Sequence, residues 1–191
     1  MARSKKRKKK SADLLADIRS ADDKVRTRAW QGAGEVGAAA IRPLAKVVNE
    51  EEGEVARAAK RGLWQIVRFT GGPEAKGKDR VIQRLIALLK DKQPNALRRE
   101  VVWMLSEIGG DESIEPLAGL LAYQELREDA KAALQRIPGE KSLQALKSAL
   151  ASAPEDFQLS VAQSLRQRGE KVAGLPCVKL KPTKKTKVKP L

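Results

Sequence analysis

Apolar residues recur along the chain in five segments that share one spacing. Each segment has an apolar side chain at its first position and again four, eight and eleven positions later. These positions fall on one face of a helix, so the pattern predicts five amphipathic helices. The segments span 25–36, 55–66, 97–108, 126–137 and 157–168. Only Arg168 places a charge at one of the apolar positions.

A second apolar pattern occupies the sequence between these segments. Ile or Leu stands at its first position, and apolar residues follow three and six or seven positions later. The copies span 41–48, 82–89, 114–121 and 143–150, with a degenerate first copy at 13–18. Each unit is therefore expected to be a pair of helices. One such hairpin cannot bury its apolar stripe alone, whereas a stack of hairpins can.

The regular spacing favours an all-α fold, an α-solenoid of about five helical hairpins spanning 11–169. Ala, Leu, Lys, Arg and Glu are strong helix formers, and aromatic residues, which β-sheets favour, make up only 3% of the chain. One unit is longer than the others because of residues 70–78, which are rich in Gly and predict an exposed loop. A compact helical bundle is the competing fold.

This pattern resembles the HEAT-like repeats of bilin-lyase-type and armadillo-like proteins. The resemblance is carried by residues 97–121 and 126–150, including Ile108-Gly-Gly-Asp-Glu-Ser-Ile-Glu-Pro-Leu117, and covers about 11–169. It implies a solenoid of HEAT-like hairpins whose second helices line the concave face. It says less about activity, because members of this class range from scaffolds to enzyme subunits.

If the second helices line the concave face, the positions that point away from the core form a ridge in the middle of the groove. Arg beside Trp is the combination enriched at interface hot spots, so this ridge is the predicted partner-binding groove. Its residues are Arg57, Arg61, Trp64, Arg99 and Trp103. The alternative is a solvated helix face with each indole partly buried between repeats. Trp30 lies beside an apolar column and is expected to pack in the core.

The positive charge is concentrated at the two ends of the chain. The formal net charge is +15, yet residues 11–170 hold 25 bases against 24 acids. Residues 1–10 and 170–191 are rich in Lys, poor in apolar side chains and expected to be disordered. Such tails attract DNA, RNA or another polyanion, or merely keep the protein in solution. The cations expected to contact a polyanion are Lys5, Lys6, Arg7, Lys8, Lys9, Lys10, Lys181, Lys184, Lys185 and Lys187.

The chain has no His and a single Cys, Cys177. Catalytic triads that use His, and most zinc and iron sites, therefore lack their usual ligands, and we expect no metal and no cofactor. No apolar run approaches the roughly 18 residues of a membrane helix, and no apolar signal core follows the basic start. We expect a cytoplasmic protein, with the nucleus or nucleoid as alternatives.

Three functions compete. The first is a non-catalytic scaffold or adaptor that binds an unidentified protein partner through the concave face. The second is a nucleic-acid- or ribosome-associated protein that uses the tails together with the Arg/Trp groove. The third is a HEAT-like enzyme, either a DNA glycosylase or a bilin lyase subunit. Such glycosylases use Trp and Asp in a basic groove, whereas the spacing here places no acid between Trp64 and Trp103, which disfavours an enzyme.

Overall fold

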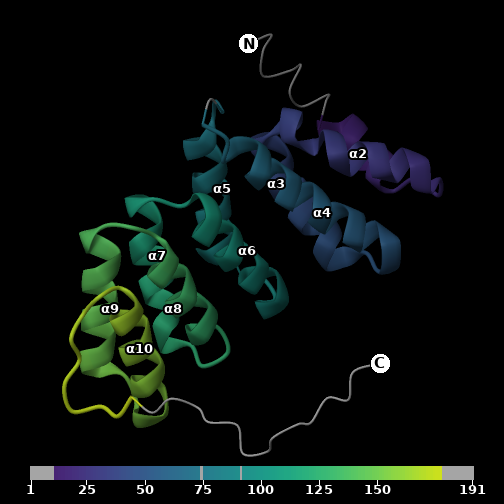
Figure 1. Cartoon of the computed structure of the whole chain (residues 1–191). Coiled ribbons are helices and arrows are strands. Elements are labelled where there is room, and N and C mark those ends of the chain that lie inside the picture. Colours follow the sequence, from purple (N-terminus) through teal and green to yellow (C-terminus); the bar gives the residue numbers. More distant parts are fainter. Residues whose placement is uncertain (1–10, 74, 91, 178–191) are drawn as a thin grey trace, which may run out of the picture.

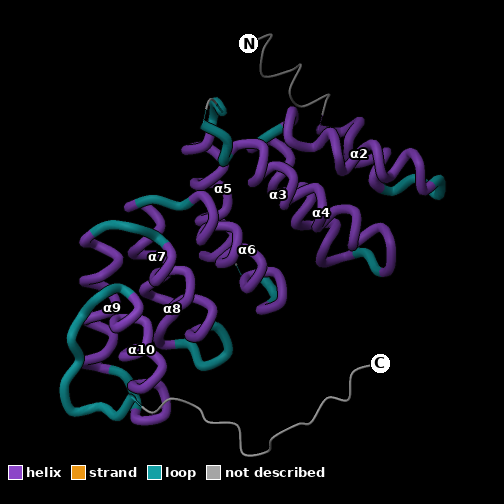
Figure 2. Tube along the Cα trace, in the orientation of Figure 1, coloured by secondary structure: helices purple, strands orange, loops and turns teal. Residues whose placement is uncertain are grey.

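The computed structural model describes residues 11–73, 75–90 and 92–177, and within these ranges every regular element is a helix. Figures 1 and 2 show the helices as hairpins stacked side by side into an arc. The all-α solenoid predicted from the repeat is therefore confirmed. A helix over residues 11–18 precedes α2 (Asp23–Val36) and completes the first hairpin.

The other hairpins follow in chain order. Their helices are α3 (Ala38–Glu50) and α4 (Gly53–Thr70), α5 (Lys78–Lys90) and α6 (Asn95–Ile108), α7 (Ile114–Ala118) and α8 (Arg127–Arg136), and α9 (Glu140–Ser152) and α10 (Glu155–Gln167). Short 3₁₀ turns flank α7 at Asp111–Ser113 and Gly119–Ala122. The predicted inserted loop lies where expected, between the end of α4 and the start of α5.

Both apolar patterns form the core. The residues eight positions into the five segments are Ala33, Leu63, Leu105, Leu134 and Leu165, and each is at most 2% exposed. These side chains join those of the first helices in one cluster that runs from residue 14 to residue 165. Because each hairpin shares this cluster with its neighbours, burial of apolar surface stabilises the stack as a whole.

The ends of α2 follow from its flanking residues. The Asp22 carboxylate accepts a hydrogen bond from the Lys24 backbone N–H at 2.7 Å, which caps the free amides of the first turn. Gly37 ends the helix with a φ of 66°, a left-handed value that favours Gly. The next helix begins at once, so a single residue separates α2 from α3.

The second helices lie along the inner side of the arc, as the family resemblance implied (Figure 1). Helix α4 packs closely on α2, and α6 packs closely on α8. Between the second and third hairpins, α4 and α6 meet over fewer residues, and α3 and α5 supply more of the contact on the outer side. Side chains rather than close helix packing must therefore connect α4 with α6.

Residues that follow α10 contact the last hairpin. The Arg166 guanidinium donates to the carbonyl oxygens of Val172 and Leu175 at 3.2 and 2.7 Å, and Glu170 pairs with Lys147 at 3.0 Å. These contacts tie Glu170, Val172 and Leu175 to the last hairpin, and the bounds of the basic tails stay a prediction. The tail cations named above lie outside the described residues.

Arg168, the exception in the apolar pattern, fastens the last hairpin to the previous one. Its Nη1 donates to the carbonyl oxygens of Leu134, Gln135 and Ile137, at 3.3, 3.2 and 2.8 Å. Its Nη2 donates to the Gly139 carbonyl at 2.9 Å. The last carbonyls of a helix have no partner within the helix, so Arg168 caps the C-terminus of α8. The charge at an apolar position thus has a structural role.

Candidate partner-binding face

The five residues of the predicted groove come together on two neighbouring inner helices, α4 and α6. Arg57, Arg61 and Arg99 are exposed, whereas Trp64 and Trp103 are half-buried. The contacts of these side chains show that part of the ridge also holds the repeats together.

Trp64 is anchored to the next repeat through its indole N–H. Its Nε1 donates to Glu100 Oε2 at 2.9 Å, and Lys60 Nζ pairs with Glu100 Oε1 at 3.0 Å. Lys60 lies one helical turn before Trp64, so both side chains approach the carboxylate from α4. This contact spans the junction between α4 and α6, which pack on each other less closely than α2 and α4 or α6 and α8 do.

Trp103 makes the equivalent contact one repeat later. Its Nε1 donates to Asp129 Oδ1 at 2.9 Å, and Arg99 Nε pairs with Asp129 Oδ2 at 2.7 Å. Arg99 also donates to the carbonyl oxygen of Glu125 at 2.9 Å. A cation and a Trp one turn apart on one inner helix thus hold a carboxylate of the next inner helix. We call each such arrangement a clamp.

The carboxylates of the two clamps occupy the same place in the repeat. Glu100 and Asp129 each stand three positions after the first residue of their segment, which we call the acceptor position. In the last repeat the acceptor position is occupied by Ser160, whose hydroxyl accepts a hydrogen bond from Lys131 at 2.7 Å.

The structure corrects the expectation that no acid lies between the two tryptophans. Sequence reasoning missed Glu100 because its position is neither in the apolar set nor in the outward set.

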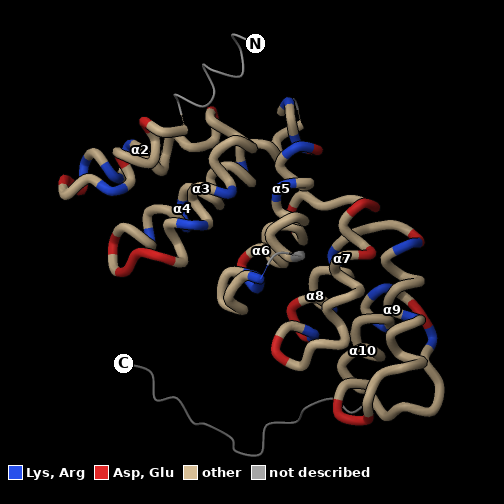
Figure 3. Tube along the Cα trace, turned by 180° about the vertical axis from the view of Figure 1, so that it is seen from behind, with Lys and Arg blue, Asp and Glu red and all other residues tan. Residues whose placement is uncertain are grey.

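The remaining groove cations are also in contact with other side chains. Arg57 pairs with Glu54 at 2.5 Å, and the Arg61 guanidinium lies 5.9 Å from the centre of the Trp30 ring. Arg68, which was not predicted, lies over Trp64 at 5.8 Å. Figure 3 shows acidic and basic residues interspersed along the helices. The inner face therefore presents aromatic rings and guanidinium groups in a largely balanced field of charge.

A pocket of about 360 Å³ lies on the inner face between α2 and α4. Its lining includes Trp30, Ala58 and Arg61, together with Asp23, Arg26, Thr27 and Glu54. Trp30 packs against the core, as predicted, but it is only half-buried and forms a wall of this pocket. One feature of the sequence could have indicated that Trp30 lies on the inner face. Arg26 precedes Trp30 by four residues, and Lys60 precedes Trp64 by the same number.

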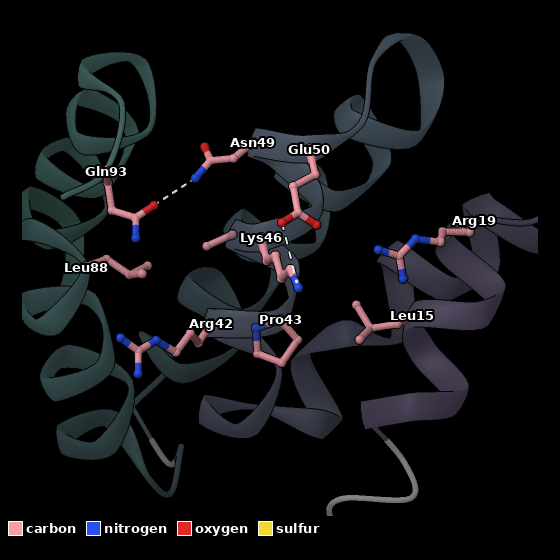
Figure 4. Close-up of a pocket in the computed structure, with 10 residues that line it drawn as sticks. Leu15, Arg19, Arg42, Pro43, Lys46, Asn49, Glu50, Leu88 and Gln93 are labelled. Carbon is pink, nitrogen blue, oxygen red and sulfur yellow. Dashed lines mark hydrogen bonds and ion pairs between the residues drawn. The ribbon is translucent and has the colours of Figure 1, made fainter. Parts of the chain in front are cut away.

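A larger cavity, of about 620 Å³, lies among the first helices of the first three hairpins (Figure 4). Leu15, Pro43 and Leu88 provide apolar walls. Several of its polar groups are already paired: Asn49 donates to Gln93 at 2.7 Å, Lys46 lies 3.7 Å from Glu50, and Arg19 pairs with Glu51 at 2.9 Å. The cavity therefore offers little unpaired charge to a ligand.

One carboxyl group near the inner face has a clearly shifted pKa. Partial burial of Glu128 raises its pKa, but hydrogen bonds from Ser160 and Lys131 and the charge of Lys131 outweigh that effect. The pKa of Glu128 therefore lies below its ordinary value. A lowered pKa keeps the group charged at neutral pH, so Glu128 acts here as an acceptor between repeats.

The described residues contain no group of three or more His, Cys, Asp or Glu side chains arranged to hold a metal ion. In the same part of the chain, every helix is too short or too polar to cross a membrane.

Residues 71–135, which hold the third and fourth hairpins, match the family model for HEAT repeats. No curated protein matches the sequence. Similar solved structures include an engineered protein, at 21% identity over 82% of this chain and 78% of that one, with a TM-score of 0.41. A designed armadillo repeat protein in complex with a (KR)4 peptide is 21% identical over 81% of this chain and 80% of that one, with a TM-score of 0.45.

A second designed armadillo repeat protein is 16% identical over 81% of this chain and 98% of that one, with a TM-score of 0.36. Structures that are similar at this distance do not indicate a partner or a binding site for this chain. The stacked hairpins and the matched segment define the class, an α-solenoid of helical repeats. Over residues 71–135 the chain is similar to HEAT repeats.

Proposed function

We propose that this protein is a non-catalytic scaffold that binds a protein partner along the inner face of the solenoid. The observation that carries the proposal is the pair of clamps, Lys60/Trp64 on Glu100 and Arg99/Trp103 on Asp129. They fix two indole rings and the guanidinium groups beside them across consecutive repeats. A surface held in place before binding loses less conformational entropy when a partner docks.

The chemistry of the inner face favours recognition over catalysis. Trp and Arg are the residues most enriched among interface hot spots, and both are present in adjacent repeats. The carboxylates between them, Glu100 and Asp129, already accept hydrogen bonds from an indole and a cation. A general base needs a carboxylate that can reach a substrate proton, and these two are committed to holding the repeats together.

The test must separate partner binding from folding. Replacing Trp64 or Trp103 with Ala would remove a clamp as well as a contact surface, so the arginines are better probes. We expect the double variant R57Q/R61Q to keep the fold, because both side chains are exposed, and to lose the partner captured by affinity purification. Nuclease and high salt during the purification exclude bridging by nucleic acid.

The matched control is R80Q/R84Q, which removes the same charge from exposed positions on the outer helix α5. It should retain the partner as well as the wild type does. Equal retention by R57Q/R61Q and the control would contradict the use of the inner face. Loss of the partner from the wild type after nuclease would contradict the protein scaffold itself.

A second candidate function, association with nucleic acid, rests on the distribution of charge. Almost all the excess positive charge lies in residues 1–10 and 171–191, which hold 14 of the 39 bases and no acid. Clusters of Lys attract polyanions with little sequence preference. These tails would concentrate the scaffold near DNA, RNA or a ribosome, while the inner face selects the protein partner.

A further inference from the structure

The first two repeats lack one contact that the later repeats make. The acceptor position holds Glu100, Asp129 and Ser160 in the third, fourth and fifth repeats, and each contacts the preceding inner helix. In the second repeat the acceptor position is Ala58. A methyl group accepts no hydrogen bond, so α2 and α4 meet without this polar contact.

Trp30 is the residue on α2 that faces this position. It stands five positions into its segment, as Lys60 and Lys131 do in theirs, and both lysines contact the acceptor residue of the next repeat. Trp30 and Ala58 line the same pocket of about 360 Å³. Within the described residues, no side chain or backbone group accepts a hydrogen bond from the Trp30 indole. The pocket therefore has a donor, as the later repeats do, but lacks the acceptor that they place opposite it.

Arg61 supplies the unneutralised cation of the pocket. It lies over the Trp30 ring, and in the part of the chain that the structure describes it forms no ion pair. The other charges cancel within their own helices, since Asp23 pairs with Arg26 and Glu54 pairs with Arg57. Arg26 also donates to the Ser20 carbonyl at 2.5 Å and is therefore occupied.

We infer that this pocket binds a carboxylate side chain, Asp or Glu, from an acidic segment of the protein partner. The carboxylate accepts from the Trp30 indole N–H and pairs with Arg61. The protein's own clamps are the template, because Glu100 and Asp129 each receive one indole N–H and one cation. A hydrogen bond between a charged group and its partner is stronger than a neutral one, so the carboxylate fixes the register of the bound segment.

A carboxylate fits the site better than a phosphate does. The pocket offers one indole donor and one unpaired guanidinium, and Asp23 and Glu54 are also among its lining residues. A phosphate carries more negative charge and more acceptor oxygens, so it would meet these two acids with fewer donors than it needs. The inference rests on the proposed scaffold function, since the ligand is taken to be part of a protein.

The three indole N–H groups provide the test. In a ¹H–¹⁵N correlation spectrum of the full chain, each Trp gives one indole signal, and the variant W30F assigns that of Trp30. Titration with acetylated hexaglutamate should shift the Trp30 signal saturably. The signals of Trp64 and Trp103 should stay nearly fixed, because their N–H groups are already bound to Glu100 and Asp129. Hexaglutamine is the uncharged control and should shift none of them.

Two variants make the assignment specific. A58E places the protein's own carboxylate in the pocket, so its Trp30 signal should start from a shifted position and no longer respond to hexaglutamate. R61Q keeps an exposed polar side chain and should weaken the response roughly tenfold, as expected for one charge-assisted hydrogen bond. If A58E does not fold, R61Q alone still tests the pocket.

Three results would overturn the inference: a Trp30 signal that does not move, equal movement of all three indoles, or a response to oligothymidylate in place of hexaglutamate. Failure of the pocket assignment can be distinguished from failure of the scaffold function. If the captured partner depends on the inner face but the Trp30 signal is silent, only the pocket assignment is wrong. If Trp30 responds but the partner is released by nuclease, the scaffold function is wrong and the carboxylate site stands.

Discussion

At the scale of single residues, the informative positions are those that depart from the repeat. Arg168 breaks the apolar pattern, and its guanidinium caps the end of α8. Ala58 replaces a polar acceptor, and a pocket lies beside it. The sequence marks both positions as exceptions. It could not say what they contact, because that depends on how adjacent hairpins are set against each other.

We expect the variant R168M to lower the free energy of unfolding by about 2–3 kcal/mol, because it leaves partly buried carbonyl oxygens of α8 without donors. Urea denaturation followed by circular dichroism measures the change. R136Q is the matched comparison, since Arg136 pairs with Glu107 at 2.7 Å on the exposed surface and should contribute less than about 1 kcal/mol. Equal effects of the two variants would refute the capping role of Arg168.

Glu128 gives the protein a small dependence of stability on pH. Its pKa is lower in the folded state than in the unfolded chain because Ser160 and Lys131 stabilise the carboxylate despite partial burial. A lowered pKa adds stability above the unfolded value, near 4.3, and that stability is lost as the pH falls through the folded pKa.

The melting temperature of the wild type should therefore fall slightly further than that of E128Q between neutral pH and about pH 4. The difference should be small because the side chain is largely exposed. A scan of thermal unfolding against pH measures it. Parallel curves for the two proteins would show that the contacts of Glu128 do not stabilise the carboxylate.

At the scale of helices, the apolar spacing was enough to predict which segments pair and where the inserted loop lies. The clamps were not predictable in the same way. The spacing of Lys60 from Trp64 and of Arg99 from Trp103 is visible in the sequence. The partners Glu100 and Asp129 are set by the rotation and offset of the next helix, which a repeat pattern does not specify.

The clamps should contribute measurably to the contact between repeats. W103F keeps an aromatic ring but removes the indole N–H, and we expect it to cost about 1–2 kcal/mol of stability. In a double-mutant cycle with D129N, the two changes should be non-additive by at least about 0.5 kcal/mol. The pair W103F and E107Q serves as control, since among the described residues no side-chain hydrogen bond joins Trp103 to Glu107. Additive effects of W103F and D129N would mean that the hydrogen bond does not connect α6 with α8.

In the whole molecule, the excess positive charge and the stacked hairpins occupy different parts of the chain. The stacked hairpins are nearly neutral, and the excess Lys lies at the two ends. The positions of Lys, Arg, Asp and Glu in the sequence allowed this separation to be predicted. The contacts of Arg166 with Val172 and Leu175 were not predictable, because they use backbone carbonyls that carry no sequence signal.

If the tails contact a polyanion, binding should be strongly dependent on salt. Engagement of about five phosphates predicts that log affinity falls with log salt at a slope of about −4.5 on duplex DNA. Fluorescence anisotropy of the full chain and of a chain lacking residues 1–10 and 178–191 measures this slope. The truncated chain should lose the binding. A slope near zero for the full chain on both DNA and RNA would remove the polyanion role.

Hydrogen exchange on the scaffold with its captured partner, after nuclease treatment, tests most directly whether the inner face binds the partner. Bound partner should slow exchange in α2, α4 and α6, which carry Trp30, Trp64 and Trp103. Exchange in the outer helices α3, α5 and α9 should be unchanged. Protection confined to the outer helices, or no protection in the solenoid at all, would contradict the claim that the inner face binds the partner.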